Sequence, residues 1–257
     1  MIEIRRIVAS EAEEFLGLLC GVFHLDISRA RPVFYDTVLF DLSRKWALFE
    51  DGRLVSILTT TGLSFGWGKC VGIAGVATRE GQQGRGFGQR LLEHVLEVAE
   101  SEGEGPAMLF AHQETLYRRV GFVLTDEVIR GPISTVKMSP DQTPFSNSEV
   151  QHMYKTWSEG SPDRLVRTHD RWRYWGLACR ICEPFLDGYA CVEPGLIREA
   201  VSFGKADKWP VPSGSEWYGL RSVTSACSVP VKRPEVELLF MTRGVPRQPQ
   251  MFMTDQF

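Results

Sequence analysis

Residues 70–102 read CVGIAGVATREGQQGRGFGQRLLEHVLEVAESE, and this stretch decides the fold. Its first part mixes small and β-branched residues, which is typical of a strand covered on both faces. Its last part repeats apolar residues at a spacing of three and four, from Leu91 to Ala99, which predicts a helix with one buried face. Between them, Gln83-Gly84-Arg85-Gly86-Phe87-Gly88 predicts a glycine-rich turn.

A glycine-rich turn that leads into a helix suits a ligand that carries phosphate groups. Glycine has no Cβ, so a ligand can approach the backbone, and the first N–H groups of a helix have no partner within it. These donors, the positive helix end and Arg85 together predict a phosphate socket. The turn lacks the Gly-Lys-Ser/Thr ending of a P-loop and the G-x-G-x-x-G spacing of a dinucleotide-binding turn.

The pattern from Gln83 through Gly86 to Gly88 resembles the acyl-CoA signature Gln/Arg-x-x-Gly-x-Gly/Ala of the GCN5-related N-acetyltransferase (GNAT) superfamily. A second motif, ETLYRRVGF at residues 114–122, predicts a short helix that ends at Gly121. It resembles the Leu-Tyr-x-x-x-Gly-Phe element of the same family, in which the tyrosine hydroxyl lies near the CoA sulfur. Tyr117 is that residue here. Many relatives carry an Asn before this helix, and this chain does not.

The resemblance implies a GNAT fold, an α/β fold whose mixed, mostly antiparallel central sheet is flanked by helices. It also implies that the strand within 70–78 and the strand at 107–111 splay apart, so that backbone groups pair with the pantetheine arm. The residues expected to bind the acetyl-CoA co-substrate are Val76, Thr78, Gln83, Gly84, Arg85, Gly86, Phe87 and Gly88.

Local signals on the N-terminal side predict the remaining elements of this fold. Residues 2–8 predict an edge strand, and Ser10 predicts the N-cap of a helix. Residues 26–43 predict a second helical segment with Pro32 in its first turn. A hairpin is expected from residues 46–61, with its turn at Asp51-Gly52.

Composition excludes several classes of function. The chain has 257 residues and a net charge of −3, and it shows no basic stripe, so we expect no nucleic-acid partner. We find neither a signal peptide nor an apolar run of membrane-spanning length, so we expect a cytoplasmic protein with no membrane partner and with reduced cysteines. Cys179 and Cys182 form one CxxC pair without a second, and no metal is expected.

The chain changes character after Met138, where Ser139–Pro144 read as a linker. We therefore expect a GNAT domain at residues 1–139 and a smaller α+β domain at residues 140–257. Two helices and a three-stranded meander are predicted within the second part.

The second part resembles the degenerate GNAT unit of Eis-type tandem acetyltransferases, and thus half a GNAT fold. The resemblance is carried by Tyr154, Arg167 and Trp172, followed by Gly188-Tyr189-Ala190 and Ile197-Arg198-Glu199. Eis-type enzymes also carry a sterol-carrier-like domain, for which this chain is too short.

Candidate catalytic residues follow from the expected chemistry. Tyr117 can protonate the leaving thiolate as a general acid. A neutral amine needs a base, and His112 titrates in the useful range at the end of a predicted strand. Glu80 and Glu114 are further candidates. The Eis-type resemblance implies instead that the carboxylate of a terminal Phe, here Phe257, serves as the base.

The expected function is transfer of an acetyl group from acetyl-CoA to a primary amine by direct attack in a ternary complex. The resemblance places Asp26, in the run Phe23-His24-Leu25-Asp26, near the acceptor. Two alternatives stay open: a non-catalytic module that binds or senses acyl-CoA, and a structural partner without affinity for it. The identity of the amine, the length of the acyl group and the oligomeric state are left open.

Overall fold

The computed structural model describes residues 1–36, 40–136, 145–178, 182–185, 187–193, 195–204 and 207–257. The N-terminal half forms β1 (Ile2–Arg6), α1 (Ala12–Phe23), α2 (Ile27–Phe34), β2 (Lys45–Glu50), β3 (Arg53–Phe65), β4 (Gly68–Thr78), α3 (Phe87–Ser101), β5 (Ala107–Ala111), α4 (Thr115–Arg119) and β6 (Val123–Pro132). The C-terminal half forms α5 (Asn147–Glu159), α6 (His169–Ala178), β7 (Cys182–Phe185), β8 (Gly188–Glu193), β9 (Leu196–Val201), β10 (Glu216–Leu220), α7 (Arg221–Ala226) and β11 (Glu235–Arg243). Short 3-10 helices lie at Ala9–Glu11, Leu42–Arg44 and Met253–Asp255.

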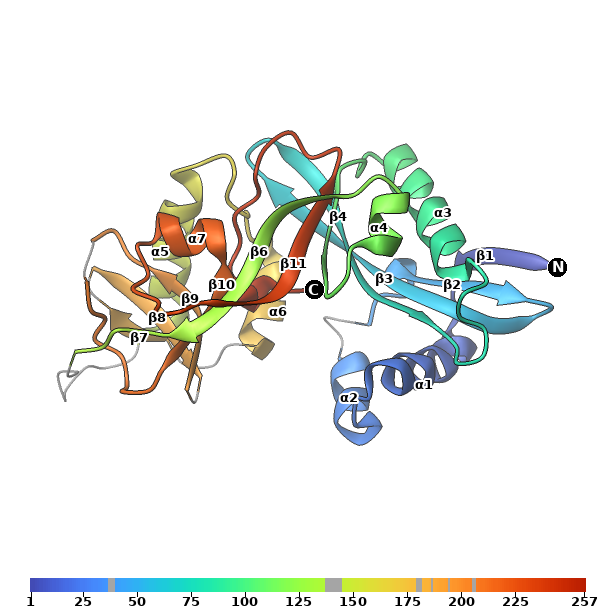
Figure 1. Cartoon of the computed structure of the whole chain (residues 1–257), viewed down its shortest axis with the longest axis horizontal. Helices are drawn as coiled ribbons and strands as arrows, with labels where there is room; N and C mark the ends of the chain where they lie inside the picture. Colours follow the sequence, from blue (N-terminus) through green and yellow to red (C-terminus); the bar gives the residue numbers. More distant parts are fainter. Residues whose placement is uncertain (37–39, 137–144, 179–181, 186, 194, 205–206) are drawn as a thin grey trace.

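The described strands join in one sheet, in the order β1-β2-β3-β4-β5-β11-β6-β10-β9-β8-β7 (Figure 1). Neighbouring strands are antiparallel, except that β4 with β5 and β9 with β10 are parallel. The sheet is therefore mixed and mostly antiparallel, with helices packed on it, and the predicted fold class is confirmed. Among the described residues, no helix has both the length and the apolar character needed to span a bilayer.

Strand β11 lies between β5 and β6, although most of the C-terminal half separates it from them in sequence. Its Leu239 pairs with Ala111 of β5 on one side and with Glu127 of β6 on the other. The expected linker falls largely at residues 137–144, which lie outside the described residues. The division at residue 139 thus stays a proposal about the sequence, and in space the two halves share this sheet.

Helices cover both faces of the N-terminal part of the sheet. Side chains alternate between the two faces along a strand, and β2 shows this directly. Trp46 and Leu48 of β2 pack in the apolar cluster that includes the buried face of α3. Ala47 and Phe49 pack in the cluster formed with α1. The glycine turn therefore connects a strand of this sheet to α3, and the buried side chains of α3 fix that helix on the sheet.

Strands β4 and β5 separate at the position that the GNAT resemblance implied. They pair only from Val71 with Ala107 to Ile73 with Leu109, while β4 continues to Thr78. Gly75 has a φ of +60°. It lies where the pairing of β4 with β3 shifts register, so a bulge bends the end of β4. The edge of β4 beyond Ile73 is therefore not paired with β5.

Two local predictions were wrong. Ser10 does not cap the first long helix, because a 3-10 turn precedes α1 and the Glu11 carboxylate accepts a hydrogen bond from the Val8 N–H at 2.9 Å. The same carboxylate binds the Arg5 guanidinium through two hydrogen bonds. Helix α2 begins at Ile27, which puts Pro32 in its second turn rather than its first.

Candidate active site

The glycine turn forms an open surface at the beginning of α3. Gly84 and Gly86 have φ values of +77° and +79°, and a Cβ at either position would meet no atom within 4 Å. The left-handed backbone, rather than crowding, therefore favours glycine at these positions. Gly86 is the N-cap of α3 and no side chain caps the helix, so the N–H groups of the first turn face the open side. This arrangement can accept phosphate oxygens.

The end of β4 and the glycine turn are held together. The Gln83 side-chain amide donates a hydrogen bond to the Thr78 carbonyl oxygen at 3.2 Å. The Thr78 hydroxyl lies 3.0 Å from the Ser56 hydroxyl on β3. A Cβ at Gly88 would lie 3.4 Å from the Thr78 hydroxyl and 4.0 Å from the Val76 side chain. The turn and the separated strand edge are therefore continuous, and the eight predicted CoA-binding residues lie along them, with Phe87 buried beneath the turn.

Arg85 is bound by a carboxylate in this structure. Its guanidinium forms two hydrogen bonds with Glu50 at the end of β2, at 2.6 and 2.9 Å. It also packs over the Phe87 ring, with 4.6 Å between the guanidinium carbon and the ring centroid. Phe87 itself is buried. A phosphate group at this turn would therefore compete with Glu50 for Arg85.

Tyr117 extends from α4 and packs against the cluster on the α3 face, to which Val76 of β4 also contributes. Its ring lies edge-on to Phe122, with the centroids 6.2 Å apart. Burial raises the pKa of the Tyr117 phenol. The phenol therefore stays protonated at neutral pH, as a general acid must.

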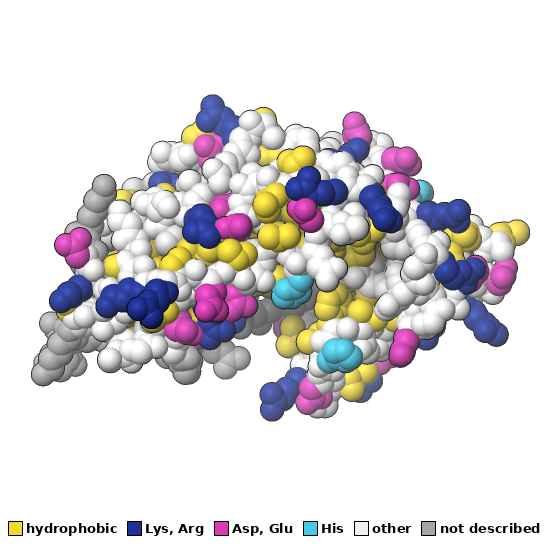
Figure 2. Space-filling view, viewed as in Figure 1, with side chains coloured by type: hydrophobic (Ala, Val, Ile, Leu, Met, Phe, Trp, Pro, Cys, Tyr) yellow, Lys and Arg dark blue, Asp and Glu magenta, His cyan; other side chains and the backbone are white. Residues whose placement is uncertain are grey.

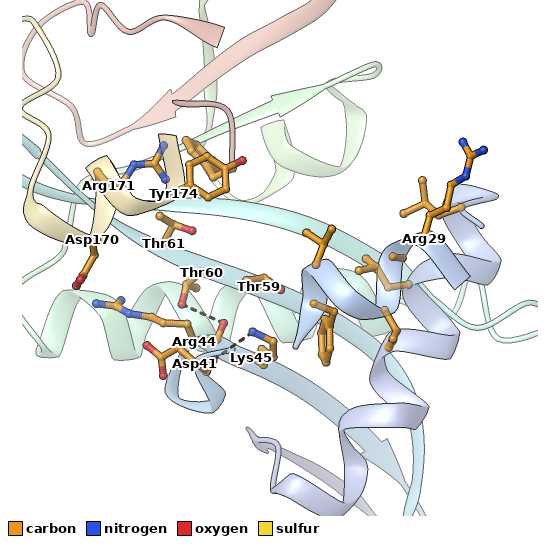
Figure 3. A pocket seen from close by; sticks show the side chains of 18 of the residues that line it. Arg29, Asp41, Arg44, Lys45, Thr59, Thr60, Thr61, Asp170, Arg171 and Tyr174 are labelled. Atoms are coloured by element: carbon orange, nitrogen blue, oxygen red, sulfur yellow. Dashed lines mark hydrogen bonds between the residues drawn. The ribbon is translucent and has the colours of Figure 1, made fainter. Parts of the chain in front are cut away.

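A cavity of about 860 Å³ lies on the face of the sheet that α1 and α2 cover. Its walls come from α1 and α2, from β3 at Thr59–Gly62, and from α6 (Figure 3). Figure 2 shows the surface hollowed between α1–α2 and the C-terminal half. The cavity touches β4 through two lining side chains, since a Cβ built on Gly75 would lie 3.0 Å from Leu19 and one on Gly72 would lie 2.8 Å from the Phe257 ring.

The structure brings some of the predicted site residues into this cavity and leaves others outside it. Asp26 and Phe257 line the cavity, whereas His112 is exposed and is not among the lining residues. Asp26 is also the N-cap of α2, where its carboxylate accepts a hydrogen bond from the Ser28 N–H at 2.9 Å. Tyr117 lies on the α3 side of the sheet.

Helix α6 positions the segment that ends at Phe257. The Arg171 guanidinium donates hydrogen bonds to the backbone oxygen of Asp255 at 2.5 Å and to its carboxylate at 3.2 Å. The Tyr174 hydroxyl donates to the Gln256 carbonyl oxygen at 2.6 Å. The Phe257 ring then packs on Phe110 of β5, with the centroids 5.5 Å apart. The C-terminal half therefore contributes directly to the cavity.

A buried charged cluster lies behind this segment. The Arg167 guanidinium pairs with Glu199 and Asp255 at 2.5 and 2.7 Å, and all three side chains are fully buried. Burial opposes the charge on Arg167, but the two carboxylates outweigh it and raise the pKa of the guanidinium. Tyr189 and Trp175 also bind Glu199. The cluster fixes Asp255 to β9 of the C-terminal half.

Comparisons with known proteins agree with this geometry. A glycine turn at a helix N-terminus, beside two strands that separate, is the arrangement of an acyltransferase domain. Residues 3–125 match the family model described as an acetyltransferase (GNAT) domain, and the predicted resemblance to the GNAT superfamily is confirmed over this part of the chain. No curated protein matches the chain.

Solved structures share the fold over nearly the whole chain. A GCN5-related N-acetyltransferase from Kribbella flavida superposes with a TM-score of 0.71 at 15% identity, over 94% of this chain and 70% of that one. One from Anabaena variabilis gives 0.68 at 14% identity, over 95% and 72%. Eis1 from Mycobacterium abscessus gives 0.57 at 15% identity, over 93% and 73%. The predicted resemblance to an Eis-type fold is confirmed, and identities this low speak for the fold alone.

Sequence reasoning missed several residues of the cavity. Lys45, Arg171 and Tyr174 line it but belong to no motif. A buried lysine at the beginning of a strand leaves no pattern in a single sequence, so no signal could have found Lys45.

Proposed function

We propose that this protein is an N-acetyltransferase that moves an acetyl group from acetyl-CoA to a primary amine. One observation carries the proposal: the open turn of α3 continues into the separated edge of β4, and Leu19 and Phe257, which line a cavity that can hold a second substrate, pack against this strand. A site of this form brings a phosphate-bearing donor and an acceptor to the same strand.

The eight residues of the turn and strand edge would hold the donor. Backbone N–H groups at the beginning of α3 would bind phosphate oxygens, and Arg85 would add its charge after leaving Glu50. The amides of the pantetheine arm would pair with β4 near Val76 and Thr78, as an added strand does. The thioester carbonyl would then lie near Ala74–Val76.

Direct attack then needs no covalent enzyme intermediate. The neutral amine nitrogen attacks the thioester carbon, and a strand N–H stabilises the negative oxygen of the tetrahedral intermediate. When the carbon–sulfur bond breaks, its electron pair leaves with the sulfur, and Tyr117 gives its phenolic proton to the thiolate. The raised pKa of Tyr117 supports this role, because it keeps that proton in place until it is needed.

The base that takes the proton from the amine stays a prediction. Phe257 lines the cavity and His112 is exposed outside it. A His112→Ala variant tests the second candidate: an unchanged rate and pH profile would remove His112 from the mechanism. A large loss of rate at neutral pH, together with loss of the acidic fall in the wild-type pH profile, would identify it as the base.

Calorimetric titration of acetyl-CoA tests the donor site. Gly86→Glu places a carboxylate in the open turn and should abolish binding. Gly103→Glu is a matched control, because Gly103 also has a positive φ, of +82°, with no atom near a Cβ, but lies just beyond the other end of α3. It should bind acetyl-CoA as the wild type does. Equal losses in both variants would show that the glutamates act through folding.

Thiol release with a panel of amines tests catalysis. Binding together with CoA release from one or more amines supports the acetyltransferase. Binding without release from any amine would favour the alternative, a non-catalytic acyl-CoA-binding module. Failure of the wild type to bind would overturn the proposed function.

A further inference from the structure

The cavity is balanced in charge rather than acidic. Its lining holds the acidic residues Asp26, Asp41 and Asp170 and the basic residues Arg29, Arg44, Lys45 and Arg171. Asp41, like Asp26, is engaged at the beginning of a short helix, where it accepts hydrogen bonds from the Ser43 N–H and hydroxyl at 2.9 and 2.6 Å. A polyamine would therefore find no excess of negative charge here.

Three of the basic side chains pair with carboxylates of the protein, and the weakest pair joins Arg29 to Asp26 at 3.7 Å. Arg44 forms a two-pronged pair with Glu104, at 2.6 and 2.9 Å. Arg171 pairs with Asp255 at 3.2 Å. These contacts turn the guanidinium groups of Arg44 and Arg171 toward carboxylates of the protein itself.

Lys45 lies in a different environment, at the beginning of β2 and only 4% exposed. Its ammonium lies over the rings of Phe34 and Phe40, 5.0 and 5.7 Å from their centroids, and donates to the Asp41 carbonyl oxygen at 3.4 Å. Burial lowers the pKa of this ammonium. An incoming carboxylate would offset that loss of hydration.

The position of Lys45 relative to β4 sets the length of an acceptor that could reach both. Lys45 pairs with Thr59 on β3, and Thr59 pairs with Ala74 on β4. Two strand spacings separate Lys45 from Ala74, which is about 10 Å. The apolar side chains Leu19, Val33 and Phe34 line the cavity on the α1–α2 side.

We propose that the acceptor is a monoamine with a carboxylate at the far end of an apolar chain, and that Lys45 binds this carboxylate. The inference rests on the proposed function, because the amine must reach the thioester near Ala74. An α-amino acid is too short for the span, since its amine and carboxylate share one carbon. An ω-amino acid such as 6-aminohexanoate has the required separation of its two charges.

The test compares 6-aminohexanoate with hexylamine and 1,6-diaminohexane, which match its chain length, and with glycine, which is shorter. We expect kcat/KM for 6-aminohexanoate to exceed that for the other three by at least tenfold. In Lys45→Met the KM for 6-aminohexanoate should rise by at least tenfold, and the advantage of 6-aminohexanoate over hexylamine in kcat/KM should be lost. Lys69→Met is the matched control, because Lys69 is exposed on β4 and does not line the cavity.

The other outcomes separate this inference from the proposed function. A preference for the diamine, or an equal loss for every amine in Lys45→Met, would overturn the role of Lys45 as a carboxylate anchor. Calorimetry of 6-aminohexanoate with CoA-saturated protein gives a readout that does not depend on turnover. Binding that Lys45→Met abolishes supports the anchor even if no amine releases thiol, whereas no binding to the wild type overturns it.

Discussion

The ring of Phe257 lies against the backbone of Gly72 in β4, at a position where β4 still pairs with β5. A Cβ at Gly72 would fall 2.8 Å from the Phe257 ring. Two residues that are distant in the sequence are thus in contact where β4 meets a side chain that lines the cavity. The lack of a side chain at Gly72 lets the C-terminal segment enter this space.

Gly72→Ala should therefore lower the rate of acetyl transfer. The new methyl group would displace the Phe257 ring, and a shift of about 1 Å in a catalytic site can cost about a hundredfold in rate. Stability should change little, because the ring can move. Steady-state thiol release and thermal unfolding measure the two effects. Gly17→Ala on α1 is the control, since no atom lies within 4 Å of its Cβ position, and equal rates in both variants would contradict the prediction.

Tyr117→Phe should lower kcat by about 10²–10⁴-fold, the usual contribution of a general acid. The sign of the pH dependence follows from burial, which raises the phenol pKa above 10.0. The acid form thus persists at neutral pH, and kcat should not fall on the alkaline side until the pH passes about 10. Rates in wild type, Tyr117→Phe and the control Tyr218→Phe check this. An alkaline limb near pH 8 would exclude Tyr117 as the acid.

Glu50→Gln should tighten binding of acetyl-CoA. The substitution removes the negative charge that holds Arg85, so that the guanidinium can bind phosphate instead. Partly exposed ion pairs contribute about 0–1 kcal/mol, so the dissociation constant should fall by up to about fivefold. Calorimetry measures it, with Glu102→Gln as control, because Glu102 pairs with Arg6 just beyond the other end of α3. Weaker binding in Glu50→Gln would show that the observed pair orders the turn for its ligand.

Glu199→Gln should destabilise the protein by about 3–5 kcal/mol, because it leaves the buried charges on Arg167 and Arg171 with the single carboxylate of Asp255. Glu193→Gln, in a partly exposed pair with Arg198 at 3.6 Å, should change stability by about 1 kcal/mol or less. Urea unfolding of both variants gives the comparison. Similar midpoints would contradict the importance of the buried cluster.

Alkaline pH should weaken the fold. Burial raises the phenol pKa values of Tyr154 and Tyr189 well above 10.0. Below pH 10 both phenols are protonated in the folded and unfolded chains, and stability is complete. Above it, only the unfolded chain loses these protons, so each phenol lowers the free energy of unfolding by about 1.4 kcal/mol per pH unit. Urea unfolding at pH 8 to 11 measures the slope, which Tyr154→Phe should reduce; an unchanged slope would contradict the assignment.

The elements around the glycine turn were predictable because their signals are local. The 3–4 spacing from Leu91 to Ala99 depends only on one helix, and the positive φ angles at Gly84 and Gly86 depend only on one turn. The same holds for the hairpin turn at Asp51-Gly52. Each of these features is set by neighbours within a few residues.

The rest of the site could not be predicted, because it is built from distant segments. The residues that carried the Eis-type resemblance, among them Tyr154, Arg167 and Glu199, meet only after α5, β9 and the C-terminal segment pack together. Lys45, Thr59 and Arg171 likewise come from separate elements. A pattern along one sequence carries no record of which elements will be neighbours.

The placement of β11 also bears on how the protein is made. The strands on either side of it, β5 and β6, leave the ribosome long before residues 235–243 have been synthesised. Until then no strand lies between the facing edges of β5 and β6, and the sheet of the N-terminal half is incomplete. The sheet is therefore completed only after residues 235–243 have been synthesised, so a ribosome stalled before them holds an unfinished sheet with two edges open to other chains.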